Sequence, residues 1–150
     1  MTVHQLGDAR VLIAGGSRGI GLAIATAFAR HGARLGLCAR GIDGLQRARD
    51  TLQAGGAQVH VQACDLADPA QIQAWVEAAA TALGGIDIVV NNASGFGHGN
   101  DDASWQAGFD IDLMAAVRTN RLALPYLRRS AIPAILNVSS INARVPTPRA

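Results

Sequence analysis

Glycines crowd the segment at residues 14–21, which reads Ala-Gly-Gly-Ser-Arg-Gly-Ile-Gly. Glycines at positions 15, 19 and 21 would let the backbone turn tightly and approach a ligand without Cβ collisions. An apolar run precedes the segment and a helical pattern follows it, and a helix N-terminus offers free N–H groups and a positive dipole end. Because that environment suits a pyrophosphate, the segment predicts a nucleotide-binding loop, with a merely tight turn as the alternative.

Polar residues also follow the later apolar runs. Asp65, the pair Asn91–Asn92 and the pair Ser139–Ser140 each come directly after one. If those runs are parallel strands, their carboxyl ends meet at the edge where ligands bind. Each of these residues also has a purely structural alternative to ligand binding. The asparagines would form an ordinary turn, the serine would end a strand, and Asp65 would shape the turn before the next helix.

The cofactor type is indicated by two arginines. The second apolar run ends Cys-Ala-Arg at Arg40, no acid follows until Asp43, and Arg18 lies inside the glycine-rich segment. An acid at the end of this strand binds a ribose 2′-hydroxyl, whereas a 2′-phosphate needs cations. Arginine suits a phosphate because its planar fork can hold two oxygens. The missing acid also argues against an S-adenosylmethionine site. The alternative to a phosphate-binding role for Arg40 is an ordinary loop residue surrounded by solvent.

Short apolar runs alternate with helical stretches along the chain. Strands are expected at residues 10–14, 35–39, 58–64, 86–90 and 134–138, and helices at 19–31, 42–54, 69–83 and from a loop at 94–102 to about 129. This alternation predicts parallel βαβ units. We therefore expect an α/β fold, a Rossmann-like doubly wound parallel sheet with helices on both faces and five strands, in one domain over residues 1–150.

Composition excludes several classes of protein. The 150 residues are 49% hydrophobic and 16% charged, which argues against disorder. No apolar run approaches the roughly 18 residues of a membrane span, and the first ten residues lack the apolar stretch of a signal peptide. All thirteen basic residues are arginines, scattered along the chain, so no nucleic-acid surface is expected. Cys38 and Cys64 are expected to be reduced thiols in a cytoplasmic protein, and no metal site is expected.

The glycine pattern Gly-x-x-x-Gly-x-Gly resembles the Thr-Gly-x-x-x-Gly-x-Gly motif of the short-chain dehydrogenase/reductase family, with Ala14 in place of Thr. Further segments are similar to that family in the same order. They are Cys64-Asp-Leu66, Asn91-Asn-Ala-Ser-Gly95 (with Ser94 inserted before the glycine), Trp105–Leu113 and Asn137-Val-Ser-Ser140. The resemblance covers essentially the whole chain.

The resemblance implies NADP(H) as the cofactor. The loop would hold the pyrophosphate, Arg18 and Arg40 the 2′-phosphate, Asp65 the adenine end, and Asn92 with its neighbour the nicotinamide ribose. The implied cofactor contacts are Gly15, Ser17, Arg18, Gly19, Ile20, Gly21, Arg40, Asp65, Leu66, Asn92, Ala93 and Ser94.

The resemblance also implies part of a catalytic site. In the family a Tyr exchanges the proton, a Lys lowers its pKa, a Ser binds the substrate oxygen, and an Asn carbonyl holds a water. Ser140 matches the Ser and Asp112 occupies the Asn position. The single tyrosine, Tyr126, precedes the fifth strand and has Ser130 four residues on, and the sequence has no Lys. We therefore expect an N-terminal portion of a longer protein, with C-terminal strands missing and no activity by itself.

The implied function is an NADP(H)-dependent oxidoreductase that interconverts a ketone and a secondary alcohol, most like the 3-oxoacyl-reductase branch. Its partners would be a small carbonyl or alcohol substrate and, through the apolar helix from Ile111, further copies in a dimer or tetramer. One alternative is a catalytically silent nucleotide-binding or redox-sensing module. Another is a dienoyl-CoA-reductase-like enzyme, because the segments Asn91–Phe96 and Ile111–Asp112 resemble those of that branch.

Overall fold

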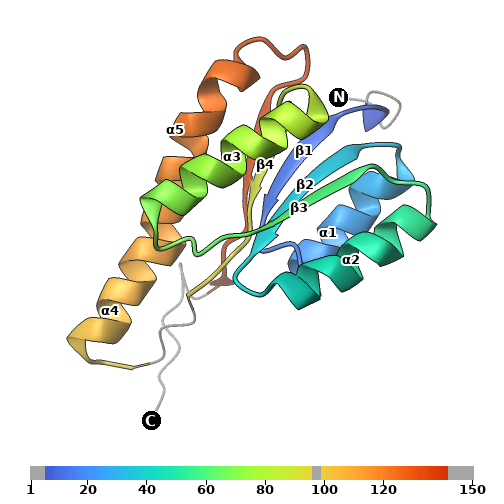
Figure 1. Ribbon diagram of the computed structural model, residues 1–150. Helices are drawn as coiled ribbons and strands as arrows, with labels where there is room; N and C mark the ends of the chain where they lie inside the picture. The colour runs from blue at the N-terminus through green and yellow to red at the C-terminus, as the bar shows by residue number, and fades with distance from the viewer. Residues whose placement is uncertain (1–5, 96–98, 142–150) are drawn as a thin grey trace.

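The computed structural model describes residues 6–95 and 99–141. Strands and helices alternate along them (Figure 1). The elements are β1 (Arg10–Ala14), α1 (Gly19–Arg30), β2 (Arg34–Ala39), α2 (Ile42–Ala54), β3 (Val59–Ala63), α3 (Pro69–Leu83), β4 (Ile88–Asn91), α4 (Asp102–Gly108), a π-helical segment (Phe109–Met114), α5 (Ala115–Leu127) and β5 (Ala134–Asn137). Some of the sequence predictions concern residues outside the described ranges. They are Phe96, which is part of the dienoyl-CoA-reductase resemblance, part of the loop expected at 94–102, and the first five residues, which belong to the segment without a signal-peptide pattern.

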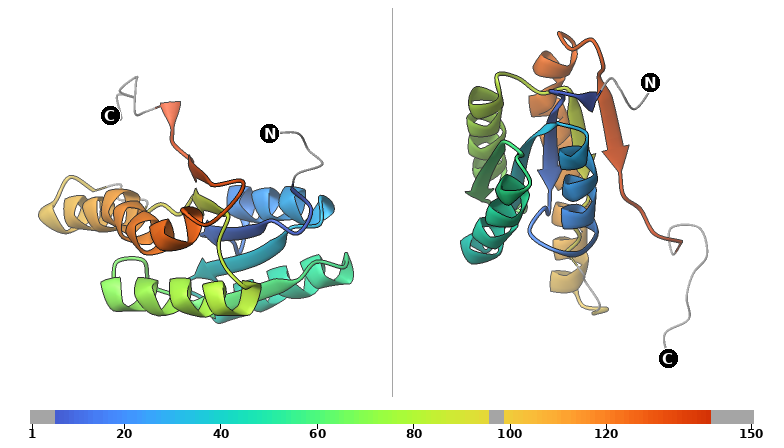
Figure 2. Two further views of the ribbon diagram at one scale, coloured as in Figure 1. Left: turned by 90° about the horizontal axis from the view of Figure 1, so that it is seen from above. Right: turned by 90° about the vertical axis from the view of Figure 1, so that its right-hand side faces the viewer.

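The strands form one parallel sheet in the order β3-β2-β1-β4-β5. The chain adds β2 and then β3 on one side of β1, and it then crosses over to add β4 and β5 on the other side. The direction of strand addition therefore reverses between β1 and β4. Seen along the strands, α1 and α2 lie on one side of the sheet and α3 and α5 on the other (Figure 2, left). The expected doubly wound α/β fold is confirmed, and ligands on such sheets bind at the carboxyl ends beside the reversal.

Alternation along β1 divides the core between the two faces. Val11 and Ile13 join the cluster under α1 and α2, while Leu12 and Ala14 join the cluster under α3 and α5. Successive side chains of a strand point to opposite faces, so a strand covered on both sides must be apolar throughout. The second cluster includes Trp75, which is completely buried.

Helix α3 begins where its sequence indicates. The Asp68 carboxylate accepts hydrogen bonds from the N–H groups of Ala70 (2.8 Å) and Gln71 (3.4 Å), and Pro69 occupies the first helical position. A hydrogen bond from the Gln71 side chain, together with these two backbone bonds, lowers the pKa of Asp68. Gly84 ends the helix in the left-handed conformation at φ 79°.

The expected long helix is interrupted. Between α4 and α5 the backbone winds as a π-helix over Phe109–Met114, and in Figure 1 α4 projects beyond the carboxyl edge of the sheet. A π-helical turn inserts residues into the helix without ending it, so apolar periodicity alone did not predict it. No helix in the described part of the chain is long and apolar enough to cross a membrane.

Strand β4 begins two residues later than expected, at Ile88 instead of Ile86. Asp87 lies directly before the strand. Its N–H donates to the Arg10 carbonyl (2.8 Å), and its carboxylate accepts from the Arg10 backbone N–H (2.9 Å) and from Nε (2.7 Å) and Nη2 of the same residue. Burial by itself would raise the pKa of Asp87, but the bonds from Arg10 and one from Ser130 lower it to about 2. This ion pair anchors the amino ends of β1 and β4.

Candidate cofactor-binding and active site

The glycine-rich segment forms the turn between β1 and α1. Gly15 and Gly19 have φ of 81° and 55°, values that side-chain-bearing residues rarely adopt. A Cβ at Gly21 would collide with the Gly15 carbonyl oxygen, so the turn closes only with glycine there. The N–H groups of Gly15 and Gly16 both donate to the Cys38 carbonyl (3.0 Å each), which fixes the turn against β2.

Helix α1 begins at Gly19 without a side-chain cap. Arg18 occupies the position before it in an extended conformation, and the first turn carries no acidic residue. The first N–H groups of a helix have no partner within it and carry the positive end of the helix dipole. The predicted loop is therefore a glycine-built turn that directs uncapped N–H groups outward, and this geometry fits a pyrophosphate.

Arg18 and Arg40 are both exposed, at the start of α1 and just after β2. Among the described residues, no hydrogen bond or ion pair holds either guanidinium. The nearby Cys38 is different, because burial raises the pKa of its thiol well above the usual value. The two arginines are thus available to an anion, whereas Cys38 belongs to the core.

Asp65 follows β3 and is exposed, as a ligand contact would be. One of its carboxylate oxygens accepts the Ala67 N–H (3.0 Å), so the side chain also shapes its own turn. Its backbone N–H donates to the Gln71 side chain (2.8 Å). Both readings of Asp65 are therefore compatible with the geometry. Leu66 is buried in the cluster under α3 and α5.

The segment after β4 packs onto the glycine turn. The Asn92 amide donates to the Gly15 carbonyl oxygen (3.1 Å), and a Cβ at Gly15 would meet the Ala93 backbone at 3.1 Å. Asn92 thus stabilises the turn whether or not it also contacts a ribose. Ser94 is exposed beside it.

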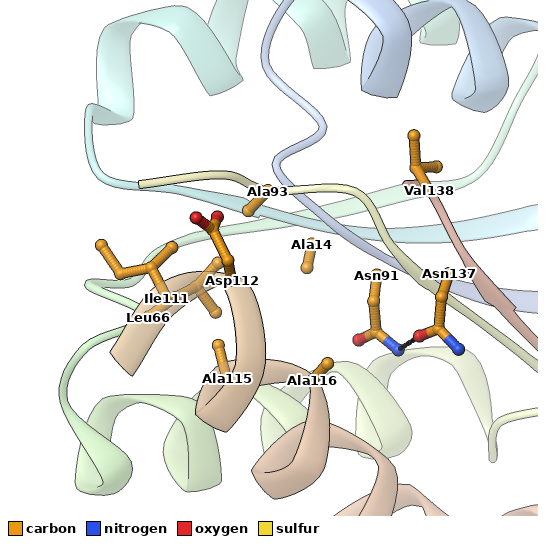
Figure 3. A pocket seen from close by; sticks show the side chains of 10 residues that line it. All are labelled: Ala14, Leu66, Asn91, Ala93, Ile111, Asp112, Ala115, Ala116, Asn137 and Val138. Carbon is orange, nitrogen blue, oxygen red and sulfur yellow. Dashed lines mark hydrogen bonds between the residues drawn. The ribbon is translucent and has the colours of Figure 1, made fainter. Parts of the chain in front are cut away.

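A pocket of about 50 Å³ lies where β1, β4 and β5 end (Figure 3). The π-helical segment contributes Asp112 to it, an exposed carboxylate whose Oδ1 accepts the Gly95 N–H (2.8 Å). The Asp112 side chain holds the segment after β4 in place, because the π-helical turn carries it to the rim of the pocket.

Ser140 comes two residues after Val138, which lines the same pocket, and Ser140 is exposed. Tyr126 lies elsewhere. It packs half-buried against the cluster under α3 and α5, with the Arg129 guanidinium 5.5 Å from its ring centre. Tyr126 therefore contributes to the packing of the core.

Sequence reasoning missed one residue of this region, Asn120. The Asn91 amide nitrogen donates to the side-chain oxygens of Asn120 and Asn137, at 2.9 Å each. We call these three residues the asparagine cluster. A polar residue in the middle of a helical pattern carried no local signal of a partner 29 positions away. In the described ranges, 6–95 and 99–141, no group of three or more His, Cys, Asp or Glu side chains could hold a metal ion.

Comparison with known proteins gives a family match. The family model described as "short chain dehydrogenase" matches residues 9–150. A Streptomyces violaceoruber protein, named as a ketoacyl reductase of the granaticin polyketide synthase, is 48% identical over 88 residues, covering 59% of this chain and 32% of its own. The chain spans about half the length, or less, of the curated relatives it matches.

Solved structures agree on the fold and differ in the bound nucleotide. A metagenomic short-chain oxidoreductase in complex with NADP superposes with a TM-score of 0.87 at 31% identity, covering 95% of this chain and 66% of its own. A Burkholderia phymatum short-chain dehydrogenase/reductase in complex with NAD gives 0.88 at 28% identity, covering 99% and 54%. The comparisons therefore support nucleotide binding without selecting between the two cofactors.

Proposed function

This chain belongs to the short-chain dehydrogenase family, and from that premise we propose that it is the NADP(H)-binding part of an oxidoreductase that interconverts a ketone and a secondary alcohol. One observation carries the choice of NADP(H). Two exposed arginines lie at the carboxyl ends of the strands, Arg18 before the uncapped N-terminus of α1 and Arg40 just after β2, and no acid ends β2. A bidentate guanidinium recognises a phosphate well, whereas a 2′-hydroxyl site needs an acceptor.

The remaining cofactor contacts follow from the carboxyl edge of the sheet. The N–H groups at Gly19–Gly21 would bind the pyrophosphate, with Ser17 and Ile20 beside it. Asp65 and Leu66 would contact the adenine end. Asn92, Ala93 and Ser94 would line the nicotinamide ribose, held there by the bond from Asn92 to Gly15.

NADPH supplies a hydride when bound, and this chain's residues would place the substrate to receive it. The Ser140 hydroxyl would donate a hydrogen bond to the substrate oxygen. Asp112 would hold the segment after β4 through Gly95, which keeps the nicotinamide end of the pocket in shape. The ketoacyl reductase among the relatives supports a carbonyl substrate.

We propose further that residues 1–150 form the larger part of one cytoplasmic domain and that the domain self-associates. Both cysteines are free thiols, as in reducing compartments. An exposed apolar row runs along α4, the π-helical segment and α5, formed by Trp105, Phe109, Leu113 and Val117. A second copy would cover this row, so replacing Leu113 by Glu should convert a dimer or tetramer into monomers in sedimentation.

Turnover tests the proposed activity. The full-length protein should oxidise NADPH in the presence of a 3-oxoacyl thioester or another ketone, and Ser140→Ala should lower kcat at least about tenfold while NADPH affinity is retained. Ser139→Ala is the matched control and should have little effect. Tight NADPH binding without turnover on any carbonyl would instead identify a silent nucleotide-binding module.

A further inference from the structure

A second pocket, of about 330 Å³, lies at the opposite end of the sheet from the glycine turn. It is formed by the C-terminal ends of α3 and α5, which pack against each other (Figure 1), and by Arg10, the first residue of β1. The full length of β1 therefore separates this pocket from the turn at Gly15. Its volume is in the usual range of small-molecule sites, roughly 300 to 1,000 Å³.

Arg129 gives this pocket a cation that the fold leaves free. The residue is exposed, and among the described residues no hydrogen bond or ion pair holds its guanidinium. The guanidinium carbon lies 5.5 Å from the centre of the Tyr126 ring, a cation–π contact that restricts the side chain. Such a contact uses a face of the guanidinium and leaves the N–H groups at its edge for an acceptor. Arg129 is therefore positioned by Tyr126 and keeps its donors for a ligand.

Arg10 adds a second guanidinium whose donors are only partly used. Three of its five N–H groups donate hydrogen bonds, to the two Asp87 carboxylate oxygens and to the Gly84 carbonyl, so two remain. The side chain is 26% exposed. Gly85 makes room for it, because a Cβ at that position would collide with Arg10 Nη1. Arg10 is thus held firmly in the pocket wall with donors to spare.

The charge at this pocket is positive. None of the described residues that line it is acidic. Asp87 balances the charge of Arg10, and both of its carboxylate oxygens are already occupied by that residue. Carbonyl groups at the C-terminal end of a helix would repel an anion, but here the Gly84 carbonyl accepts from Arg10 and the Tyr126 carbonyl accepts from the Arg129 N–H (3.0 Å). The charge of Arg129 is therefore not compensated by the pocket.

We propose that this pocket binds a small organic oxyanion, a carboxylate or a phosphate monoester, whose charged group is held by Arg129 and by the free N–H groups of Arg10. The planar fork of a guanidinium matches two oxygens of either group. The Tyr126 ring and the Ala80 methyl group also line the pocket and contact the apolar part of the ligand. The site is separate from the cofactor site and does not depend on which nucleotide the protein binds.

Titration of the full-length protein with two probes, phenyl phosphate and phenylacetate, tests the site by calorimetry. We expect one saturable site with a Kd of about 1 mM for at least one probe, and the two titrations show which oxyanion is preferred. Arg40→Ala, which alters the proposed 2′-phosphate site, should bind the probe as wild type does. Failure of both probes to saturate the protein by about 20 mM would overturn the proposal. Probe binding that is lost in Arg40→Ala would also overturn it, because the probe would then occupy the cofactor site.

Arg129→Ala and Arg128→Ala form a matched pair of variants. Each removes one positive charge from neighbouring exposed residues, and only Arg129 lines the pocket. Arg129→Ala should weaken probe binding at least about tenfold, whereas Arg128→Ala should leave it within about twofold of wild type.

Arg129→Lys tests the guanidinium fork in a protein whose charge is unchanged. It should weaken probe binding several-fold, because an ammonium group cannot hold two oxygens as a fork does. Circular dichroism should show that each variant is folded. Equal weakening by Arg128→Ala and Arg129→Ala would mean that general charge attraction binds the probe, and it would contradict a site in this pocket.

Discussion

Arginines at the two ends of the strands differ in whether the fold supplies them with partners. At the edge formed by the amino ends of the strands, which we call the amino edge, the Arg10 guanidinium donates hydrogen bonds to Asp87 and to the Gly84 carbonyl (2.6 Å). At the carboxyl edge, Arg18 and Arg40 extend into solvent without a partner among the described residues. A guanidinium satisfied inside the fold contributes to stability, whereas one kept free can bind a ligand. The fold thus separates stability from cofactor binding, and variants at the two edges should separate them too.

The largest effect is expected at the glycine turn. Gly21→Ala would drive a Cβ into the Gly15 carbonyl, so the turn must open and the first N–H groups of α1 move away from the pyrophosphate position. We expect NADPH affinity to fall more than about a hundredfold and stability to drop by about 3 kcal/mol. Gly7→Ala, at the amino ends of the strands, is the control, because a Cβ there would make only an ordinary contact with the His31 carbonyl oxygen (3.9 Å), and it should leave NADPH affinity unchanged. Calorimetric titration that finds near-normal binding by Gly21→Ala would show that the turn is not the binding element.

At the amino edge, Asp87 should affect stability and not cofactor binding. Asp87→Ala leaves Arg10 without its carboxylate, and we expect a loss of about 2 to 3 kcal/mol in urea unfolding because one partner of a largely buried pair is removed. NADPH affinity should stay within about twofold of wild type. A large loss of affinity in a folded Asp87→Ala protein would show that the two edges are coupled.

The same pair gives a pH signature. The pKa of Asp87 is about 2 in the folded protein, below the ordinary aspartate value near 4. A lowered pKa contributes stability above the unfolded value, and this contribution is lost as the pH falls from about 4 to about 2. Wild type should therefore lose more stability in that window than Asp87→Ala does. Parallel pH profiles for the two proteins would contradict the ion-pair account.

A smaller effect is expected where the segment after β4 meets the turn. Asn92→Ala removes the hydrogen bond to the Gly15 carbonyl (3.1 Å) and should cost about 1 kcal/mol of stability and several-fold in NADPH affinity. Asn100→Ala, at an exposed position, should change neither quantity. If Asn92→Ala binds NADPH like wild type, the bond to Gly15 is not needed to shape the site.

The strands, the helices and the glycine turn could be predicted because local patterns encode them. Continuous apolar runs mark buried parallel strands, and Asp68-Pro69 marks a helix start whose capping bonds are present in the structure. The end of β2 could likewise be placed to within a residue, which put Arg40 at the carboxyl edge.

The long-range contacts could not be predicted. Asn120 meets Asn91 across 29 residues, and Arg10 meets Asp87 across 77, so no window of sequence contains either pair. The π-helical turn that brings Asp112 to the pocket also departs from the helical period on which the prediction relied. Local order was readable from the sequence, whereas the pairing of polar groups depended on the tertiary fold.

Comparative binding tests most directly whether Arg18 and Arg40, at the carboxyl ends of the strands, select NADP(H). The Kd values of NADPH and NADH should be measured for the full-length protein, for Arg40→Ala, and for Arg30→Ala, an exposed arginine at the far end of α1. We predict that wild type prefers NADPH at least about tenfold and that Arg40→Ala loses about tenfold or more toward NADPH, with NADH nearly unchanged. Arg30→Ala should match wild type. Equal affinity of wild type for the two cofactors, or unchanged NADPH binding by Arg40→Ala, would contradict the account.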